Sequence, residues 1–257
     1  MNIPNIRLLN QQLVNPLFHE PKELVSWMGA MQAQNYPMVK WAVGMRLKSA
    51  TIQAVEKALR EGEILRTHVM RPTWHLVAAE DIRWMLKLSA QRIISANDSF
   101  AKGYDLDIPD ELYAKGHQLL EKILCGKKSL TKQEIAEHFN RSGILADNHR
   151  MTRFMARAEQ EGIICSGASE LTTEQWKEQT WYIHDACRTR GKLTDDIHLL
   201  PSYDEYLLGY KDRTDVLPLE HYPKAFTNNG LFFPIILHKG QVVGNWNKSA
   251  KKKGLDL

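Results

Sequence analysis

The sequence has few cysteines and lacks a long apolar run. Its 257 residues include only Cys125, Cys165 and Cys187, which are odd in number and far apart. This pattern argues against a disulfide framework and favours a reducing compartment, so we expect the protein in the cytoplasm. No apolar segment reaches the roughly 20 residues of a membrane-spanning helix, and the first residues lack the basic and apolar regions of a signal peptide.

Several motifs of enzyme chemistry are also missing. The sequence has no Gly-rich phosphate loop, no dinucleotide-binding fingerprint and no nucleophile elbow of the GxSxG type. His184 and Cys187 have the spacing of metal ligands, but no second pair accompanies them. We therefore expect neither a metal nor an organic cofactor.

Apolar residues and a mild basic excess are present. Hydrophobic residues make up 43% of the chain, which is enough for a core, and the net charge is +4. Basic residues cluster at 66–71, 150–157, 188–192 and 248–253. Such clusters form either a solvated surface or a contact with a polyanion, and charge alone does not separate the two.

The first hundred residues predict helices followed by a hairpin. Apolar residues recur at helical spacing, and then the period changes to the alternation of strands around a turn at Pro72. Thr51 is a predicted N-cap, and Gly62 ends the helix that Thr51 starts. The predicted elements are helices over 21–31, 39–47, 52–61 and 80–94, with strands at 63–66 and 73–77.

The second hundred residues repeat this order. Thr131 and Glu134 form a predicted capping box, with Leu130 and Ile135 as its hydrophobic staple. The predicted elements are helices over 110–124, 132–142 and 148–161, with strands at 163–165 and 180–183. Helix, turn, helix and a two-stranded wing is the order of a winged helix, and two copies in sequence indicate a diverged repeat.

We therefore predict an α+β fold that is mainly α with small β-hairpins. It consists of tandem winged-helix domains plus a short C-terminal β-containing segment. The first winged-helix unit with its flanking helices covers residues 1–100, and the second covers 101–185. Residues 186–257 form a linker and a partial C-terminal β-hairpin region, with a short helix at 204–208 and a hairpin over 232–246 that turns at Lys239-Gly240.

Several motifs, in the same order along the chain, resemble the AlkZ/YcaQ-like winged-helix proteins. They are Met31-Gln32-Ala33-Gln34, Trp41-Ala42, the run from Arg66 to Leu76, and Leu200 to Tyr206 followed by Gly209 to Arg213. Those proteins are bacterial DNA glycosylases, and some of them unhook purines that are crosslinked or carry bulky alkyl groups. Family members contain three winged helices, whereas here a third unit is missing across 185–196.

The resemblance implies that Gln32 and Gln34 are catalytic, with Ala33 as the apolar residue between them. An amide does not titrate and cannot act as a general base, but it can orient a water and place a carbonyl dipole near developing positive charge. That suffices when the leaving group is already cationic, as an alkylated purine is. The resemblance thus implies a monofunctional DNA glycosylase that hydrolyses the N-glycosidic bond of alkylated purines. Without the family, two such glutamines near a helix end are capping or surface residues.

The predicted partner is double-stranded DNA, bound by a monomer. The candidate DNA-binding residues are Arg66, His68, Arg71 and His75 on the first wing, and Arg150, Arg153 and Arg157 on the solvent side of helix 148–161. Alternatively, His75 is a half-buried strand residue, Arg66 pairs with an acid, and the arginine helix packs on another repeat. Asp204 and Glu205 cap a helix start rather than form an acid–base pair, because adjacent side chains point in different directions.

Two other functions fit the same pattern. The chain could be a non-catalytic winged-helix DNA-binding protein of the transcription-regulator type, or an inactive truncated relative of the glycosylases. The Gln-Ala-Gln motif favours the enzyme over the regulator, which has no need of it. The gap at 185–196 favours the inactive relative.

Overall fold

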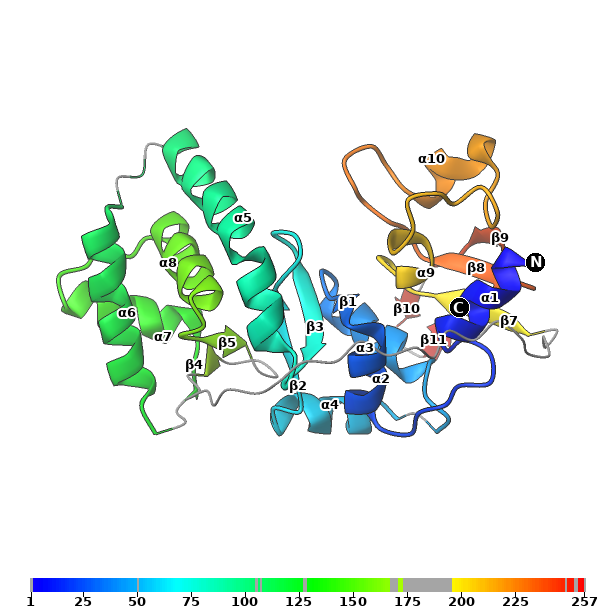
Figure 1. Cartoon of the computed structure of the whole chain (residues 1–257), viewed down its shortest axis with the longest axis horizontal. Helices are drawn as coiled ribbons and strands as arrows, with labels where there is room; N and C mark the ends of the chain where they lie inside the picture. Colours follow the sequence, from blue (N-terminus) through cyan, green and yellow to red (C-terminus); the bar gives the residue numbers. More distant parts are fainter. Residues whose placement is uncertain are drawn as a thin grey trace. The chain divides into compact units, whose positions relative to one another are not determined.

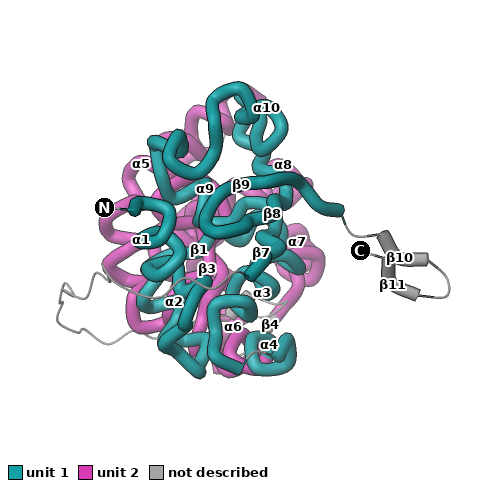
Figure 2. The backbone as a smooth tube through the Cα atoms, turned by 90° about the vertical axis from the view of Figure 1, so that its right-hand side faces the viewer, with its two compact units in different colours: residues 1–56, 182–257 teal, residues 57–181 magenta. Residues whose placement is uncertain are grey.

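A computed structural model describes residues 2–49, 51–104, 106, 108–126, 129–166, 171–172, 196–247, 249–251 and 254–256. The chain divides into two compact units, residues 1–56 with 182–257 and residues 57–181 (Figures 1 and 2). Helices and small antiparallel sheets give the predicted α+β fold. The compact units have other boundaries than the three predicted segments, because the two ends of the chain share one core. Within the described part, every helix is too short or too polar to cross a membrane.

The first unit combines short helices with a three-stranded antiparallel sheet in the order β7-β8-β9. Its N-terminal elements are α1 (Ile3–Asn10), α2 (Pro21–Met28), β1 (Ala30–Gln32), α3 (Tyr36–Gly44) and the start of α4 (Ile52–Arg60). Its C-terminal elements are β7 (Ile197–Leu200), α9 (Glu205–Leu208), η1 (Leu219–His221), α10 (Tyr222–Ala225), β8 (Ile235–His238), β9 (Gln241–Asn245), β10 (Ser249–Lys251) and β11 (Gly254–Asp256).

The hairpin of β8 and β9 turns where the sequence predicts it. Lys239 and Gly240 have φ values of 48° and 77°, the two positive values that a tight two-residue hairpin turn requires. Helix α1, which the sequence did not predict, packs on this turn: a Cβ added to Gly240 would lie 2.8 Å from the Pro4 Cβ. The core between α1 and the sheet contains Leu8, Leu9, Leu13, Val14, Leu200, Tyr206, Leu207, Val216, Leu217, Ala225, Ile235 and Leu237.

The second unit contains a hydrophobic core formed by α6, α7 and α8, and an antiparallel sheet in which β3, β2, β5, β6 and β4 are neighbours in that order. Its elements are β2 (Ile64–His68), β3 (Trp74–Ala78), α5 (Ile82–Gly103), α6 (Asp110–Leu124), β4 (Ser129–Leu130), α7 (Lys132–Arg141), α8 (Asn148–Gln160), β5 (Cys165–Ser166) and β6 (Leu171–Thr172). Helix α8 packs along α5 and α6 (Figure 1).

The predicted signals at helix starts and ends are confirmed in both units. The Thr131 backbone N–H donates to Glu134 Oε2 at 2.7 Å, and the Glu134 N–H donates back to Thr131 Oγ1 at 3.3 Å, which is the predicted capping box. Thr51 Oγ1 accepts from the Ala54 N–H at 3.1 Å at the start of α4, and Gly62 after it has a φ of 72°.

Two predicted element boundaries in the second unit are wrong. The helix expected over 80–94 continues to Gly103, because Ile93, Asn97 and Ala101 keep a buried face at helical spacing. The strand expected at 163–165 is β5, shifted to Cys165–Ser166, and its described partner is β6. The strand predicted at 180–183 and the linker at 185–195 lie outside the described residues.

Candidate active site

The Gln-Ala-Gln motif lies between a short strand and a helix start. The helix predicted over 21–31 ends at Met28 because Gly29 takes a φ of 72°, and the chain then forms β1. The side-chain oxygen of Asn35 accepts from the Met38 N–H at 3.3 Å and starts α3. Gln32 is 8% exposed, whereas Gln34 is exposed to solvent.

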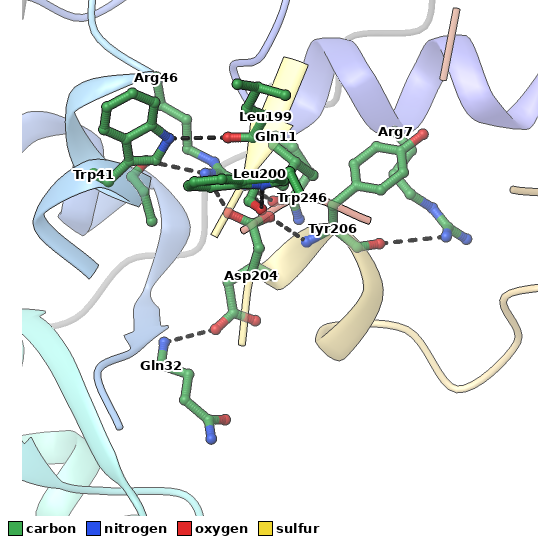
Figure 3. Close-up of polar contacts among 12 residues, drawn as sticks. Arg7, Gln11, Gln32, Trp41, Arg46, Leu199, Leu200, Asp204, Tyr206 and Trp246 are labelled. Atoms are coloured by element: carbon green, nitrogen blue, oxygen red, sulfur yellow. Dashed lines mark hydrogen bonds and ion pairs between the residues drawn. The ribbon is translucent and has the colours of Figure 1, made fainter. Parts of the chain in front are cut away.

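Glu205 holds the backbone of the motif. The Gln32 N–H donates to Glu205 Oε1 at 2.7 Å, and in Figure 3 the Gln32 side chain extends away from this contact. On the other side of the motif, Asn35 Nδ2 donates to Ser202 Oγ at 3.4 Å. The segment 199–206 therefore contacts the chain at both ends of the motif and holds its main chain in place.

A buried ion pair anchors segment 199–206. Arg46 Nη2 and Nη1 donate to Asp204 Oδ1 and Oδ2 at 2.6 and 2.9 Å, and both side chains are excluded from solvent (Figure 3). The same guanidinium donates to the Ala42 carbonyl at 3.0 Å and to Gln11 Oε1 at 3.3 Å. Two parallel hydrogen bonds fix the carboxylate in one orientation, so Arg46 determines where the next residue, Glu205, lies.

Two tryptophans hold the first residues of this segment, which belong to β7. Trp41 Nε1 donates to the Leu199 carbonyl at 2.9 Å, and Trp246 Nε1 donates to the Leu200 carbonyl at 2.7 Å (Figure 3). Their rings lie 6.2 Å apart. Asp204 also caps α9 by accepting from the Tyr206 N–H at 2.9 Å, which confirms the predicted capping role. Asp204 and Glu205 thus have different partners, as expected for adjacent side chains.

Sequence reasoning missed the roles of Arg46 and Glu205. Arg46 lies 158 positions from its partner, and Glu205 lies 173 positions from Gln32. No periodicity or capping pattern reports contacts over such separations. The signal that could have found them was the recurrence of the Leu200–Tyr206 motif together with the Gln-Ala-Gln motif in one family.

The hairpin β2–β3 holds the predicted wing residues in different environments. The Arg66 guanidinium lies 4.2 Å from the Trp74 ring centroid, and the His68 ring lies 3.8 Å from it. His68 Nδ1 is also 2.5 Å from Glu159 Oε2 of α8. Arg71 is exposed at the turn. The basic residues of this hairpin are therefore partly held by aromatic and acidic partners.

His75 does not fit a phosphate contact. It is 2% exposed, and burial lowers its pKa to about 4 although Nδ1 lies 2.9 Å from the Thr73 carbonyl oxygen. The imidazole is therefore neutral at neutral pH and faces the protein. This corrects the expectation that His75 lies on the DNA-facing surface of the wing, because β3 is buried on both faces from His75 to Ala78.

The three arginines of α8 do not form a solvent-facing row. Arg157 lies 3.6 Å from Asp110 and 3.8 Å from Asp98, and Arg153 stacks 4.6 Å from the Phe100 ring centroid. Arg150 forms an ion pair with Asp147 at 3.6 Å. The predicted exposed face was wrong because α8 packs on α5 and α6, which supply the partners of Arg153 and Arg157, while the N-cap of α8 supplies that of Arg150. DNA contact by the three arginines stays a prediction.

A metal site is absent from the described residues, where no three His, Cys, Asp or Glu side chains gather around one point. His184 and Cys187, the pair with ligand-like spacing, lie outside them. What the site offers chemically is amide oxygens and N–H groups beside a main chain fixed by a carboxylate.

Comparisons with known proteins agree with this architecture. A family model described as DNA glycosylase AlkZ-like matches residues 25–182 and 169–257, ranges that include the Gln-Ala-Gln motif and segment 199–206. Among solved structures, the chain is similar to the DNA glycosylase AlkZ of Streptomyces sahachiroi, with a TM-score of 0.72 and 16% sequence identity over 99% of this chain and 88% of that chain. This likeness shows a shared fold. No curated protein sequence matches significantly.

Proposed function

The chain belongs to the AlkZ-like DNA glycosylase family, and from this premise we propose that it hydrolyses the N-glycosidic bond of alkylated, cationic purines in double-stranded DNA. Gln34 orients the attacking water, and Gln32 supports that water or the sugar. The observation that carries the proposal is the motif itself: two amides on a main chain that Glu205 fixes, with the Gln34 side chain open to solvent.

The chemistry of the site favours a leaving group that is already charged. Glutamine cannot donate a proton to a departing base or take one from water at neutral pH. Of the carboxylates in segment 199–206, Asp204 is paired with Arg46 and Glu205 accepts the Gln32 N–H. An alkylated purine carries its positive charge on the ring and leaves without protonation, so water positioning and stabilisation of the cationic sugar suffice.

A comparison of two substrates tests this selectivity. The full-length protein should release N7-methylguanine from a duplex, and release of uracil from the matched duplex should be slower by at least about a hundredfold, the typical contribution of one general acid or base. Single-turnover release of each base, measured with protein in excess, gives the ratio. Equal or faster release of uracil would contradict the proposal, because that neutral base needs stabilisation that two amides do not supply.

The same proposal includes winged-helix units that bind the duplex. The order α6, β4, α7, α8, β5, β6 is helix, strand, helix, helix and two strands, with β5 and β6 adjacent as a wing. The hairpin β2–β3 is the wing of the unit before it. We propose that a monomer in the cytoplasm uses three residues of this hairpin, Arg66, His68 and Arg71, to contact phosphates.

Arg71 provides the test of this duplex contact. Arg71→Gln should weaken binding about equally for all duplex sequences and lower the slope of log K against log salt by about 0.9, the contribution of one phosphate contact. Fluorescence anisotropy of a labelled duplex over a salt series measures both. Arg141→Gln is the matched control, because Arg141 is exposed on α7 and pairs with Glu137 at 3.0 Å. An unchanged slope in Arg71→Gln would exclude the contact.

A further inference from the structure

Three aromatic rings stack on the surface of the second unit, where α5 ends and α8 begins. The Phe100 and Tyr104 rings have centroids 4.8 Å apart and planes at 27°, and the Tyr104 and His149 rings are 5.0 Å apart at 25°. Phe100 is 49% and Tyr104 is 53% exposed, and His149 is also exposed. We call these three residues the aromatic stack.

Exposed rings in such an arrangement need an explanation. Large aromatic side chains normally bury most of their surface, and the Tyr113, Phe139 and Phe154 rings of the same unit do so in its core. The aromatic stack instead holds its rings nearly parallel and open to solvent. Each ring restrains the next. The side chains therefore lose little conformational freedom when a flat partner stacks on them.

Two cations, Lys132 and Arg153, lie beside the aromatic stack. Arg153 places its guanidinium 4.6 Å from the Phe100 ring centroid, and Lys132 Nζ donates to Asn148 Oδ1 and Thr152 Oγ1 at 2.8 Å each. Among the described residues, neither cation forms an ion pair with a carboxylate. Burial lowers the pKa of Lys132, and the positive charge of Arg153 adds to this effect.

Two described carboxylates of α8 and α5 already have partners of their own. Asp147 accepts the His149 and Arg150 N–H groups at 2.8 and 2.9 Å as the N-cap of α8, and Asp98 pairs with Arg157. Among the described residues, Lys132 and Arg153 therefore supply the charge that faces a ligand at the aromatic stack, and this charge is complementary to an anion.

We propose that the aromatic stack, with Lys132 and Arg153, binds single-stranded DNA, an unpaired base lying on the rings and a phosphate at the two cations. Stacking rings next to unneutralised cations are the features by which proteins hold single strands. A base inside a duplex is already stacked on both faces, so the rings select unpaired bases. The choice of DNA rests on the proposed function, whereas the site is independent of Gln32 and Gln34.

Binding of a fluorescein-labelled short oligothymidine to the full-length protein tests the proposal. Phe100→Ala combined with Tyr104→Ala should weaken this binding about tenfold or more, as expected when stacking is removed, and should leave duplex binding within about twofold. Leu88→Ala is the matched control, because Leu88 is a 78% exposed apolar residue of the same helix and lies outside the aromatic stack. Arg153→Gln should lower the salt slope of oligothymidine binding by about 0.7.

A second measurement uses the wild-type protein, so it does not depend on whether a variant folds. Irradiation of the wild-type protein with an oligothymidine that carries 5-iodouracil should crosslink the base to Tyr104 or His149, identified by mass spectrometry. Crosslinks confined to other residues, or equal oligothymidine affinity in the double variant and the wild type, would overturn the proposal. Tighter binding of oligouridine RNA through the same residues would assign the surface to RNA and overturn it as well.

Base release separates this proposal from the proposed function. The double variant should still release N7-methylguanine from a duplex at the wild-type rate, because the aromatic stack is not part of the Gln-Ala-Gln motif. A wild-type protein that binds oligothymidine through the aromatic stack but releases no alkylated base would refute the glycosylase chemistry and support the single-strand site.

Discussion

Gln34→Ala is expected to lower single-turnover release of N7-methylguanine by at least about a hundredfold, the typical effect of removing one preorganised polar group from a transition state. Its thermal midpoint should stay within about 2 °C of the wild type, because an exposed side chain contributes about 0.5 kcal/mol or less to stability. The combination is the signature of a residue that acts on the reaction rather than on the fold.

Controls separate this result from a general loss of fold or of binding. Gln53→Ala removes another exposed glutamine of the first unit, on α4, and should change neither rate nor midpoint. Duplex affinity of Gln34→Ala should match the wild type, since the residue is assigned to water rather than to DNA. A midpoint lowered by many degrees, with a parallel loss of rate, would make Gln34 structural and remove the main support for the proposed chemistry.

The features that the sequence predicted correctly are those that neighbouring residues determine. The capping box at Thr131 and Glu134, the cap at Asp204 and the turn at Lys239-Gly240 each involve residues within a few positions, and the structure shows all of them. Their energetics are local, so a short window of sequence contains the necessary information.

The strand that carries Gln32 was missed for a physical reason. Leu24, Trp27, Met28 and Met31 keep helical spacing, so periodicity extends the helix beyond its true end. Gly29, with its positive φ, ends the helix. Met31 is buried, but it belongs to the strand β1 and not to the helix. The spacing of apolar residues predicts that a residue is buried, but it does not determine whether that residue lies in a helix or in a strand.

The site itself depends on contacts between distant parts of the chain. Helix α1 was not predicted because its eight residues are stabilised by a core with residues near position 200 and beyond. Arg46 was not singled out because an arginine in sequence is normally a surface residue, and only the fold brings Asp204 to it. The family motifs pointed to the right segments, but only the structure shows how they hold one another.

Arg46→Met is expected to destabilise the first unit by about 3–5 kcal/mol, because it leaves the Asp204 carboxylate buried without its partner. For a chain of this size that corresponds to a thermal midpoint lower by roughly 6–20 °C. Circular dichroism during heating measures the shift. Lys57→Met is the matched control: Lys57 pairs with Glu61 at 3.9 Å while both side chains are mostly exposed, and the expected loss is about 1 kcal/mol or less.

A second variant tests whether the buried charge is the cause. Arg46→Met combined with Asp204→Asn removes the unpaired carboxylate and keeps an oxygen that can accept the Tyr206 N–H, so it should be more stable than Arg46→Met alone. Base release should remain low in both, since Glu205 and the Gln32 main chain lose the anchor that positions them. If Arg46→Met were as stable as Lys57→Met and fully active, segment 199–206 would be held by its tryptophan and core contacts alone, and Arg46 would have no part in positioning Glu205.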